Sequence, residues 1–287
     1  MTIAGFSKVG IVGAGQMGAG ITQVCATVGL SVTLVDLAEE QLEKARTTIG
    51  KSLSKLVSKE KLTQADADNA LQQITFVTDS NRLSDADLVI ESAVENEKIK
   101  GEIFHNLDEI LQPEGIIATN TSSISITRLA SYTSRPEKFI GMHFFNPVPL
   151  MKLVEIIPGM GTSKEVTQRI EELAVGLGKE TSTSQDYPGF VVNRILLPMI
   201  NEAFTALMEG VATAEDIDKG MKLGTNQPMG PLALADFIGL DTCLAIMRVL
   251  HQGLGDPRYR PSPLLVNYVQ AGWLGRKSGR GVFRYDQ

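Results

Sequence analysis

Hydrophobic positions along the first part of the chain follow two alternating periods. Short apolar runs, typical of buried strands, occur at residues 8–12, 31–36, 74–77, 88–93, 116–119 and 139–144. Between the first two runs, apolar residues recur at helical spacing over 17–28, and helices are also predicted near 97–111 and 127–132. This regular alternation of strands and helices predicts a mostly parallel, doubly wound α/β sheet.

The pattern changes in the last third of the chain. After a predicted strand at 153–157 and a helix near 164–177, the strand pattern gives out over 181–187, and Pro188 and Gly189 interrupt the chain. Apolar residues then recur at spacings of three and four, which predicts helices at 190–208, 214–221, 232–250 and 264–271. We therefore expect an α/β domain over residues 1–186 and a smaller, all-helical domain over residues 187–287.

Composition excludes several classes of protein. The 287 residues contain 27 Lys and Arg against 33 Asp and Glu, a net charge of −6, and this mildly acidic balance disfavours nucleic acids and anionic membranes as partners. No apolar run approaches the about 18 residues of a membrane-spanning helix, and we expect a cytoplasmic protein. Cys25 and Cys243 lie far apart in predicted helices, so neither a disulfide framework nor a metal site is expected.

A glycine-rich loop follows the first predicted strand. In GAGQMG, Gly13 permits a tight turn, Gly15 lets a pyrophosphate approach the backbone, and Gly18 allows close packing of the following helix. The free N–H groups and the positive dipole end at the start of this helix favour an anion. The strand, loop and helix together predict a Rossmann-type dinucleotide-binding fold. The expected cofactor-binding residues of the loop are Gly13, Gly15, Gln16, Met17 and Gly18.

Asp36 ends the second predicted strand, roughly 20 residues after the loop, where a carboxylate can accept hydrogen bonds from ribose hydroxyls. The same carboxylate repels a 2′-phosphate, and the next residues, Leu37 and Ala38, provide no Arg to bind one. NAD is therefore the expected cofactor rather than NADP. Asp36 is also placed to cap the helix expected from Glu39, a role that is compatible with ribose binding.

The chain contains three histidines, His105, His143 and His251. His105 and His251 belong to predicted helices and are expected to be structural. His143 lies near the end of the strand at 139–144, and therefore at the carboxyl edge of the sheet, where open α/β folds bind ligands. An imidazole is a natural acid and base for moving an alcohol proton at neutral pH. A purely structural histidine at this edge is the alternative.

Two further polar groups are expected near His143. Glu155 is a single carboxylate in the apolar strand LVEII, an expensive position unless it is paired, so it is a candidate partner for the imidazole. A solvated strand face is the alternative for Glu155. The segment Asn120–Ser123 follows the strand at 116–119 and reaches the same edge, where a hydroxyl can donate to a substrate oxygen; a helix cap or turn is the alternative.

The chain as a whole resembles the L-3-hydroxyacyl-CoA dehydrogenases, and among them most closely the bacterial 3-hydroxybutyryl-CoA dehydrogenases. Long segments in the same order carry the resemblance: GAGQMGAGI, ESAVENEKIK, ATNTSSISI, GMHFFNPVPLMKLVEII, YPGFVVNRILLPMINEA, GPLALADFIGLD and GRKSGRGVFRY. The resemblance implies reversible oxidation, with NAD, of (S)-3-hydroxybutyryl-CoA or another short-chain 3-hydroxyacyl-CoA to the 3-oxoacyl-CoA. It also implies a homodimer formed through the helical second domain.

The resemblance further assigns roles to individual residues. His143 would be the catalytic acid and base, Glu155 its carboxylate partner, and Ser122 and Asn193 the groups that hold the substrate's 3-oxygen and nearby thioester region. The residues that would line the NAD site are Asp36, Glu95, Lys100, Asn120, Ser122 and Asn146. Lys51 and Lys55, four apart on a helix face, would meet the phosphates of coenzyme A, although an ordinary solvated face is the alternative.

The sequence alone is compatible with two other functions. The first is a dehydrogenase of the same architecture that acts on a free hydroxy acid or sugar acid. Turnover that depends on the coenzyme A moiety distinguishes a 3-hydroxyacyl-CoA dehydrogenase from this alternative. The other is a non-catalytic protein that keeps the dinucleotide fold, for which NAD binding without turnover is diagnostic.

Overall fold

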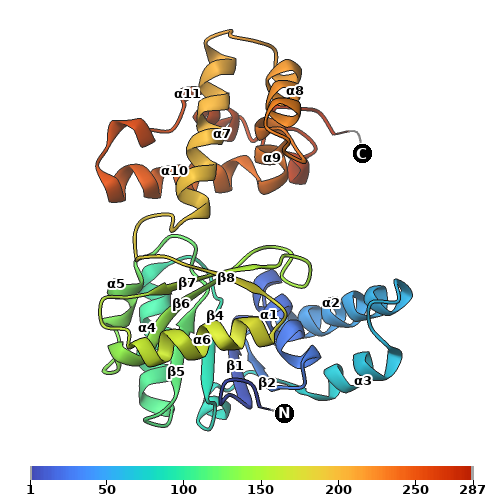
Figure 1. The fold of residues 1–287 in the computed structure, drawn as a ribbon, viewed down its shortest axis with the longest axis vertical. Helices are drawn as coiled ribbons and strands as arrows, with labels where there is room; N and C mark the ends of the chain where they lie inside the picture. Colours follow the sequence, from blue (N-terminus) through green and yellow to red (C-terminus); the bar gives the residue numbers. More distant parts are fainter. Residues whose placement is uncertain (1, 286–287) are drawn as a thin grey trace. The chain divides into compact units, whose positions relative to one another are not determined.

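The computed structural model describes residues 2–285, which form two compact units divided between Tyr187 and Pro188. The division comes one residue after the expected boundary. The first unit is a sheet flanked by helices, and the second contains helices only (Figure 1). The predicted fold class, a doubly wound α/β sheet followed by a helical domain, is confirmed.

The first unit is built on an eight-stranded sheet with the order β3-β2-β1-β4-β5-β6-β7-β8. Neighbouring strands are parallel except for β6 and β7, which are antiparallel. The strands are β1 (Lys8–Val12), β2 (Ser31–Val35), β3 (Ile74–Val77), β4 (Leu88–Glu91), β5 (Ile116–Thr119), β6 (Phe139–Phe144), β7 (Leu153–Pro158) and β8 (Glu180–Thr183). Because β6 and β7 are antiparallel, the carboxyl end of β6 meets the amino end of β7.

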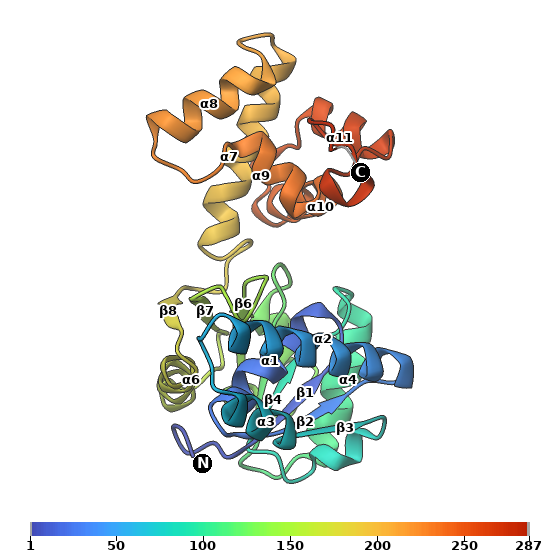
Figure 2. The ribbon, with the colours of Figure 1, turned by 90° about the vertical axis from the view of Figure 1, so that its right-hand side faces the viewer.

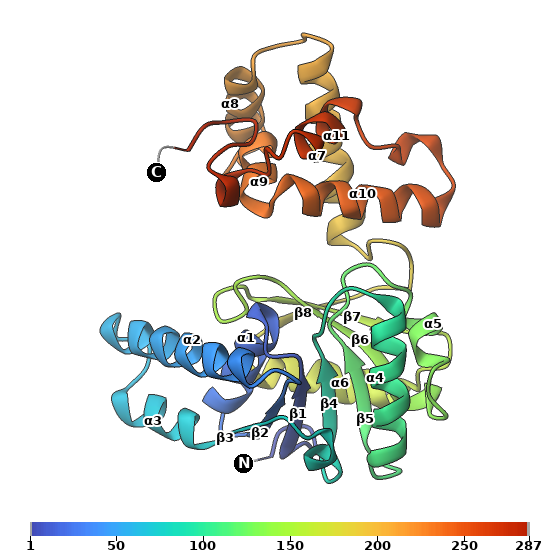
Figure 3. The same ribbon diagram turned by 180° about the vertical axis from the view of Figure 1, so that it is seen from behind.

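Helices cover both faces of this sheet, with α1 and α6 on one face and α4 and α5 on the other (Figures 1 and 3). Every residue of β4, β5 and β6 is therefore buried, which explains why these strands are nearly continuous apolar runs. The exceptions within these strands, Glu91, Thr119 and His143, are consequently buried polar groups that need partners.

The helices of the first unit are α1 (Gln16–Thr27), α2 (Glu39–Ser58), α3 (Gln64–Gln72), α4 (Glu97–Ile110), α5 (Ile126–Ala130) and α6 (Lys164–Gly176), with the short 3₁₀ turns η1 (Ser80–Leu83) and η2 (Pro136–Lys138). Most begin with a side chain that accepts from a first-turn N–H, as Asn96 does at α4 and Ser163 at α6. Helix α1 differs because its N-cap is Gly15, which has no side chain to accept a hydrogen bond. The first-turn N–H groups of α1 are thus left for another acceptor.

The second unit packs its helices around one apolar core (Figure 2). They are α7 (Val192–Met208), α8 (Ala214–Gly224), α9 (Pro231–Ile238), α10 (Leu240–Leu254) and α11 (Pro263–Gln270), with the 3₁₀ turns η3 (Pro257–Tyr259) and η4 (Arg276–Ser278). Phe204 of α7 and Met247 of α10 are fully buried in this core. No helix within residues 2–285 combines the length and apolar character needed to cross a lipid bilayer.

Two local predictions were wrong. The segment from residue 181 was expected to lack strand structure, but Glu180–Thr183 forms the edge strand β8 beside β7. Glu180 and Thr183 are exposed and the two residues between them are partly buried, so this edge strand carries polar side chains and has no apolar run. The helix expected over 232–250 is divided into α9 and α10 by Gly239, whose φ of +105° is incompatible with a continuous helix.

Candidate active site

The loop between β1 and α1 has the backbone geometry that its glycines suggest. Gly13 has a φ of +101°, and a Cβ there would lie 2.6 Å from the carbonyl oxygen of Ser92. A Cβ on Gly18 would overlap the carbonyl oxygen of Gly13, whereas no atom lies within 4 Å of the place of a Cβ on Gly15. The loop is therefore crowded beneath Gly13 and Gly18 and open at Gly15. This open backbone at the uncapped start of α1 fits a dinucleotide pyrophosphate.

Asp36 lies beside this loop at the end of β2. One carboxylate oxygen accepts from the backbone N–H of Ala14 at 2.8 Å, and the other accepts from that of Ala38 at 3.0 Å. The N-cap of α2 is Ala38, so Asp36 is not itself the cap of this helix. Its half-buried carboxylate instead joins the end of β2 to the glycine loop, the place where a ribose follows a pyrophosphate.

His143 and Glu155 form a buried pair across the antiparallel strands β6 and β7, where they are directly opposite one another. His143 Nδ1 lies 2.8 Å from Glu155 Oε2, and Glu155 is 0% exposed. Glu155 is therefore not on a solvated strand face. Since Nδ1 faces a carboxylate, Nε2 is the ring nitrogen that is oriented away from it. The ring of Phe145 packs against the imidazole, with 4.6 Å between the ring centroids.

The Thr121–Ser123 segment is organised by Glu95. One oxygen of this carboxylate accepts hydrogen bonds from Thr121 Oγ1 at 2.5 Å, from Ser123 Oγ at 2.8 Å and from the backbone N–H of Ser122 at 3.1 Å. Desolvation by itself raises the pKa of Glu95, but the Lys100 ammonium and these hydrogen bonds outweigh it and hold the pKa below its usual value. An ionised Glu95 thus keeps Ser122 in one position after β5.

Lys100 is buried beneath this segment, between two carboxylates. Its Nζ lies 2.6 Å from Glu91 Oε1 and 3.4 Å from Glu95 Oε2, and its side chain is 1% exposed. Glu91 also accepts from Thr119 Oγ1 and from the Ala93 N–H, both at 2.7 Å. Glu91 was not predicted as a site residue, although its signal in the sequence is that of Glu155: a single carboxylate in an apolar strand.

Asn120 connects this network to the strand that carries His143, because its Oδ1 accepts from the N–H of Phe144 at 2.8 Å. The structure therefore brings Ser122, Asn120 and the His143–Glu155 pair to the carboxyl ends of β5 and β6. Asn146 is exposed in the loop that follows β6, and Lys51 and Lys55 are exposed on α2. Asn193 belongs to the second unit, where it lies in the first turn of α7. His105 is exposed on α4, 3.5 Å from Glu109.

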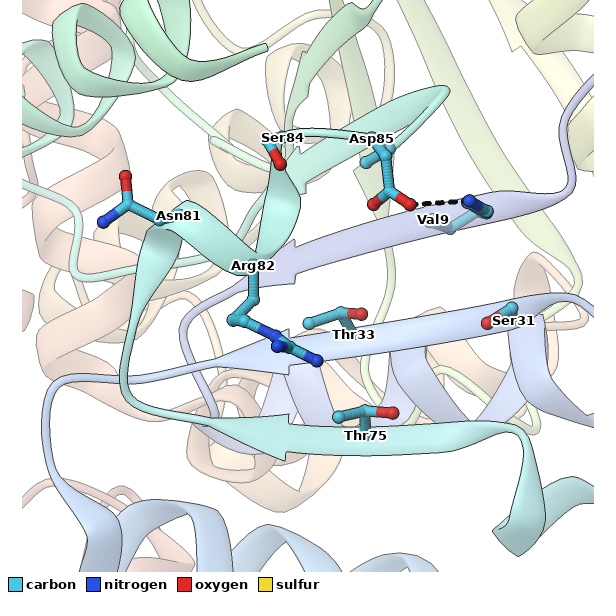
Figure 4. Close-up of a pocket in the computed structure, with 10 residues that line it drawn as sticks. Val9, Ser31, Thr33, Thr75, Asn81, Arg82, Ser84 and Asp85 are labelled. Carbon is cyan, nitrogen blue, oxygen red and sulfur yellow. Dashed lines mark hydrogen bonds and ion pairs between the residues drawn. The ribbon is translucent and has the colours of Figure 1, made fainter.

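A surface cavity of about 450 Å³ lies elsewhere, on the face of β1, β2 and β3 beneath η1 (Figure 4). Polar side chains line it, among them Ser31, Thr33, Thr75 and Arg82, and a Lys8–Asp85 ion pair closes one side. Its lining includes neither His143 and Glu155 nor any residue of the glycine loop. Within residues 2–285, no cluster of three or more His, Cys, Asp or Glu is arranged to hold a metal ion.

Comparison with known proteins matches both units of the chain. Residues 8–187 match the family model of the 3-hydroxyacyl-CoA dehydrogenase NAD binding domain, and residues 189–285 match that of the C-terminal domain of the same family. A probable 3-hydroxybutyryl-CoA dehydrogenase of Deinococcus radiodurans is 58% identical over 97% of this chain and 100% of its own length. A 3-hydroxybutyryl-CoA dehydrogenase of Bradyrhizobium diazoefficiens is 55% identical over 97% of this chain and 95% of its own.

Among solved structures, the (S)-3-hydroxybutyryl-CoA dehydrogenase of Ralstonia eutropha is similar with a TM-score of 0.96 and 55% identity. The match covers 98% of this chain and 100% of that one.

Proposed function

This chain belongs to the 3-hydroxyacyl-CoA dehydrogenase family, and from that membership we infer that it is an NAD-dependent oxidoreductase that interconverts (S)-3-hydroxybutyryl-CoA, or another short-chain 3-hydroxyacyl-CoA, and the 3-oxoacyl-CoA. The observation that carries the mechanism is the buried His143–Glu155 pair, at 2.8 Å, at the same carboxyl edge of the sheet as the glycine loop. This pair supplies an oriented acid and base where a dinucleotide fold binds its ligands.

His143 moves the proton of the substrate's 3-oxygen. Hydride transfer between C3 and the nicotinamide is the chemistry that bound NAD would supply. The neutral imidazole takes the hydroxyl proton at Nε2 as the C3–H bond breaks, and the imidazolium is stabilised by the Glu155 carboxylate at Nδ1. In the reductive direction, the same imidazolium donates to the carbonyl oxygen and then transfers its proton. The Glu155 side chain orients the ring in both directions.

The remaining site residues bind and orient. Ser122 and Asn193 hold the 3-oxygen and the thioester region, so that the reacting carbon is placed for transfer. Asp36 binds the adenosine ribose, and the glycine loop binds the pyrophosphate through Gly13, Gly15, Gln16, Met17 and Gly18. Asn120, Asn146 and Glu95 line the dinucleotide site, and Ser122 also lies near the nicotinamide. Lys100, being buried, acts there through Glu95 rather than by contact.

Consumption of NADH with acetoacetyl-CoA tests this function, measured beside free acetoacetate as substrate and beside NADPH as reductant. We expect fast turnover only when acetoacetyl-CoA is combined with NADH, and slow turnover with free acetoacetate or with NADPH. If free acetoacetate is reduced as well as the thioester, the chain is a dehydrogenase of free hydroxy acids. If NADH binds and neither substrate turns over, the chain is a non-catalytic member of the fold.

We expect Asp36→Ala to weaken NADH binding by about 10- to 100-fold, because a charge-assisted hydrogen bond to the ribose is lost. Discrimination against NADPH should fall as well, since the charge that repels a 2′-phosphate is gone. Fluorescence titration with NADH and with NADPH measures both affinities. Asp36→Asn is the matched control, because its amide oxygen still accepts from the Ala14 N–H. Asp36→Asn should lose discrimination against NADPH but bind NADH more tightly than Asp36→Ala does. Unchanged cofactor preference in Asp36→Ala contradicts the ribose role.

We expect the double variant Lys51→Ala, Lys55→Ala to raise the KM for acetoacetyl-CoA by about 10-fold, because two exposed ammonium groups no longer attract phosphates. The KM for NADH should stay the same, and added salt should raise the thioester KM less than in the wild type. Lys61→Ala with Lys98→Ala is the control, since it removes the same charge from exposed positions elsewhere in the first unit. Equal KM values for the two double variants would leave the α2 lysines without a role in binding coenzyme A.

The homodimer through the second unit and the cytoplasmic location remain proposals. Apolar side chains are exposed on the second unit, including Ile195 of α7, Leu223 of α8 and Phe237 of α9, and these support self-association. Light scattering coupled to size-exclusion chromatography measures the mass in solution, and cell fractionation measures the location.

A further inference from the structure

The loop between β6 and β7, residues 145–152, forms part of the surroundings of His143. It begins with Phe145, whose ring packs on the imidazole with 4.6 Å between centroids, and continues with Asn146. Part of the loop is held by its own backbone, because the N–H groups of Leu150 and Met151 both donate to the carbonyl oxygen of Pro147, at 3.0 Å each. These bonds shape the turn but do not attach it to the rest of the unit.

Lys179 provides such an attachment. It lies between α6 and β8, its side chain is only 7% exposed, and its Nζ donates to the carbonyl oxygens of Val148 at 2.5 Å and of Met151 at 2.8 Å. The two carbonyl groups belong to residues three apart in the loop, so one ammonium group is bonded to both of these points. The contact joins segments that are 31 and 28 residues apart in the sequence.

The environment of this ammonium is unusual for a structural lysine. Its described partners are two neutral carbonyl oxygens, with no carboxylate to offset the charge, and burial lowers the pKa of Lys179. The titratable group that faces it is the Cys25 thiol of α1, and burial raises the pKa of that thiol to about 12, so it adds no negative charge at neutral pH. An apolar side chain would fill the same space without the cost of burying a charge. The distinctive contribution of Lys179 is therefore the pair of hydrogen bonds to the loop.

Helix α1 holds the loop from another direction. A Cβ on Gly20 would lie 2.8 Å from the Cβ of Val148, so the loop packs directly on the helix that begins at the glycine-rich loop. Val148 itself is buried. The 145–152 loop is thus fastened both to the helix of the cofactor site, by packing, and to Lys179, by hydrogen bonds.

We propose that Lys179 is a positioning residue for the dehydrogenase reaction: by holding the carbonyl groups of Val148 and Met151, it fixes the 145–152 loop and so keeps Phe145 and Asn146 in place beside His143. Lys179 touches neither reactant and acts through the loop. This role rests on the proposed function, because it presumes that His143 transfers the proton.

The test is Lys179→Met, which keeps the length of the side chain and removes both donors. We expect kcat for acetoacetyl-CoA reduction to fall about 10- to 100-fold, since displacing a reacting group by an ångström costs up to about 100-fold in rate. NADH affinity should fall by about threefold or more as Asn146 shifts, while the KM for acetoacetyl-CoA stays within about twofold because no substrate contact is lost. Lys152→Met is the matched control, an exposed lysine in the same loop that should keep wild-type kcat and NADH affinity.

A purely structural role predicts a different result. If folded Lys179→Met has a lower Tm but wild-type kcat and NADH affinity per intact protomer, the proposal is overturned. If Lys179→Met does not fold, Lys179→Gln decides, because its shorter side chain keeps an N–H donor for one carbonyl only. A lower kcat in folded Lys179→Gln supports the proposal, and a wild-type kcat overturns it.

If the wild type itself does not turn over acetoacetyl-CoA, the proposed function fails, and NADH affinity then decides the role of Lys179. If Lys179→Met binds NADH more weakly than Lys152→Met does, Lys179 holds the loop in place. If the two variants bind NADH equally well, the proposal is overturned.

Discussion

His143→Gln is expected to lower kcat for acetoacetyl-CoA reduction by about 1,000-fold, with NADH affinity nearly unchanged. The amide of Gln neither gains nor loses a proton at neutral pH, so the proton transfer that a general acid and base accelerates by about 100- to 10,000-fold is lost. Because the NADH contacts proposed above do not include the imidazole, the effect belongs to kcat rather than to cofactor binding. Stopped-flow measurement of NADH oxidation with acetoacetyl-CoA gives the rate, and fluorescence titration gives the NADH affinity.

His105→Gln is the matched control for this variant. The same substitution is made there on α4, at a side chain that is 72% exposed and 3.5 Å from Glu109. It should leave both kcat and NADH affinity at wild-type values. A His143→Gln enzyme with near wild-type kcat would refute the assignment of His143 as the acid and base, and a His105→Gln enzyme as slow as His143→Gln would indicate a general effect of removing imidazoles.

Glu155→Gln is expected to lower kcat by about 100-fold. A neutral amide stabilises the imidazolium less than a carboxylate does. The amide N–H of Gln can also donate to Nδ1, and this hydrogen bond selects the tautomer in which Nε2 carries the proton. Oxidation then lacks an unprotonated Nε2 to accept the hydroxyl proton. Affinities for NADH and for acetoacetyl-CoA should stay within about threefold, because Glu155 is buried behind His143 and is 0% exposed.

Glu180→Gln provides the control for Glu155, since it is the same change at an exposed residue on the neighbouring strand β8. Its kcat should equal that of the wild type. Thermal unfolding of both variants separates a loss of fold from a loss of rate. If Glu155→Gln lowers Tm but keeps wild-type kcat per folded protomer, Glu155 stabilises the sheet and does not orient the imidazole.

Local pattern predicted most of the fold because buried strands and amphipathic helices each have their own period. The strands 8–12, 74–77, 116–119 and 139–144 were predicted with the bounds that the structure has. The edge strand β8 was missed because it is only half covered and therefore lacks an apolar run. Helix α3 was also missed, since its sequence QADADNALQ buries only Ala67 and Ala70 and gives a weak amphipathic signal.

Several residues of the site could also be predicted from the sequence, because the pattern that marks each of them lies within a short segment of the chain. The glycine loop and Asp36 belong to one continuous strand, helix and strand unit, so their spacing is set by short connections. His143 and Glu155 stood out as polar residues in apolar strands. Glu91 carried the same signal and was overlooked, because nothing along the chain indicates that Lys100 and Thr119 are its partners.

The sequence alone determines the alternation of strands and helices, the helical C-terminal part of the chain and the dinucleotide loop. Each of these features depends on residues that are close to one another in the sequence. The pairing of His143 with Glu155 depends on the antiparallel register of β6 and β7, which packing of the whole sheet sets. The same holds for Glu95 beneath Ser122 and for Lys179 on the 145–152 loop. These contacts join distant segments, and burial of the intervening core is what brings the partners within hydrogen-bonding distance.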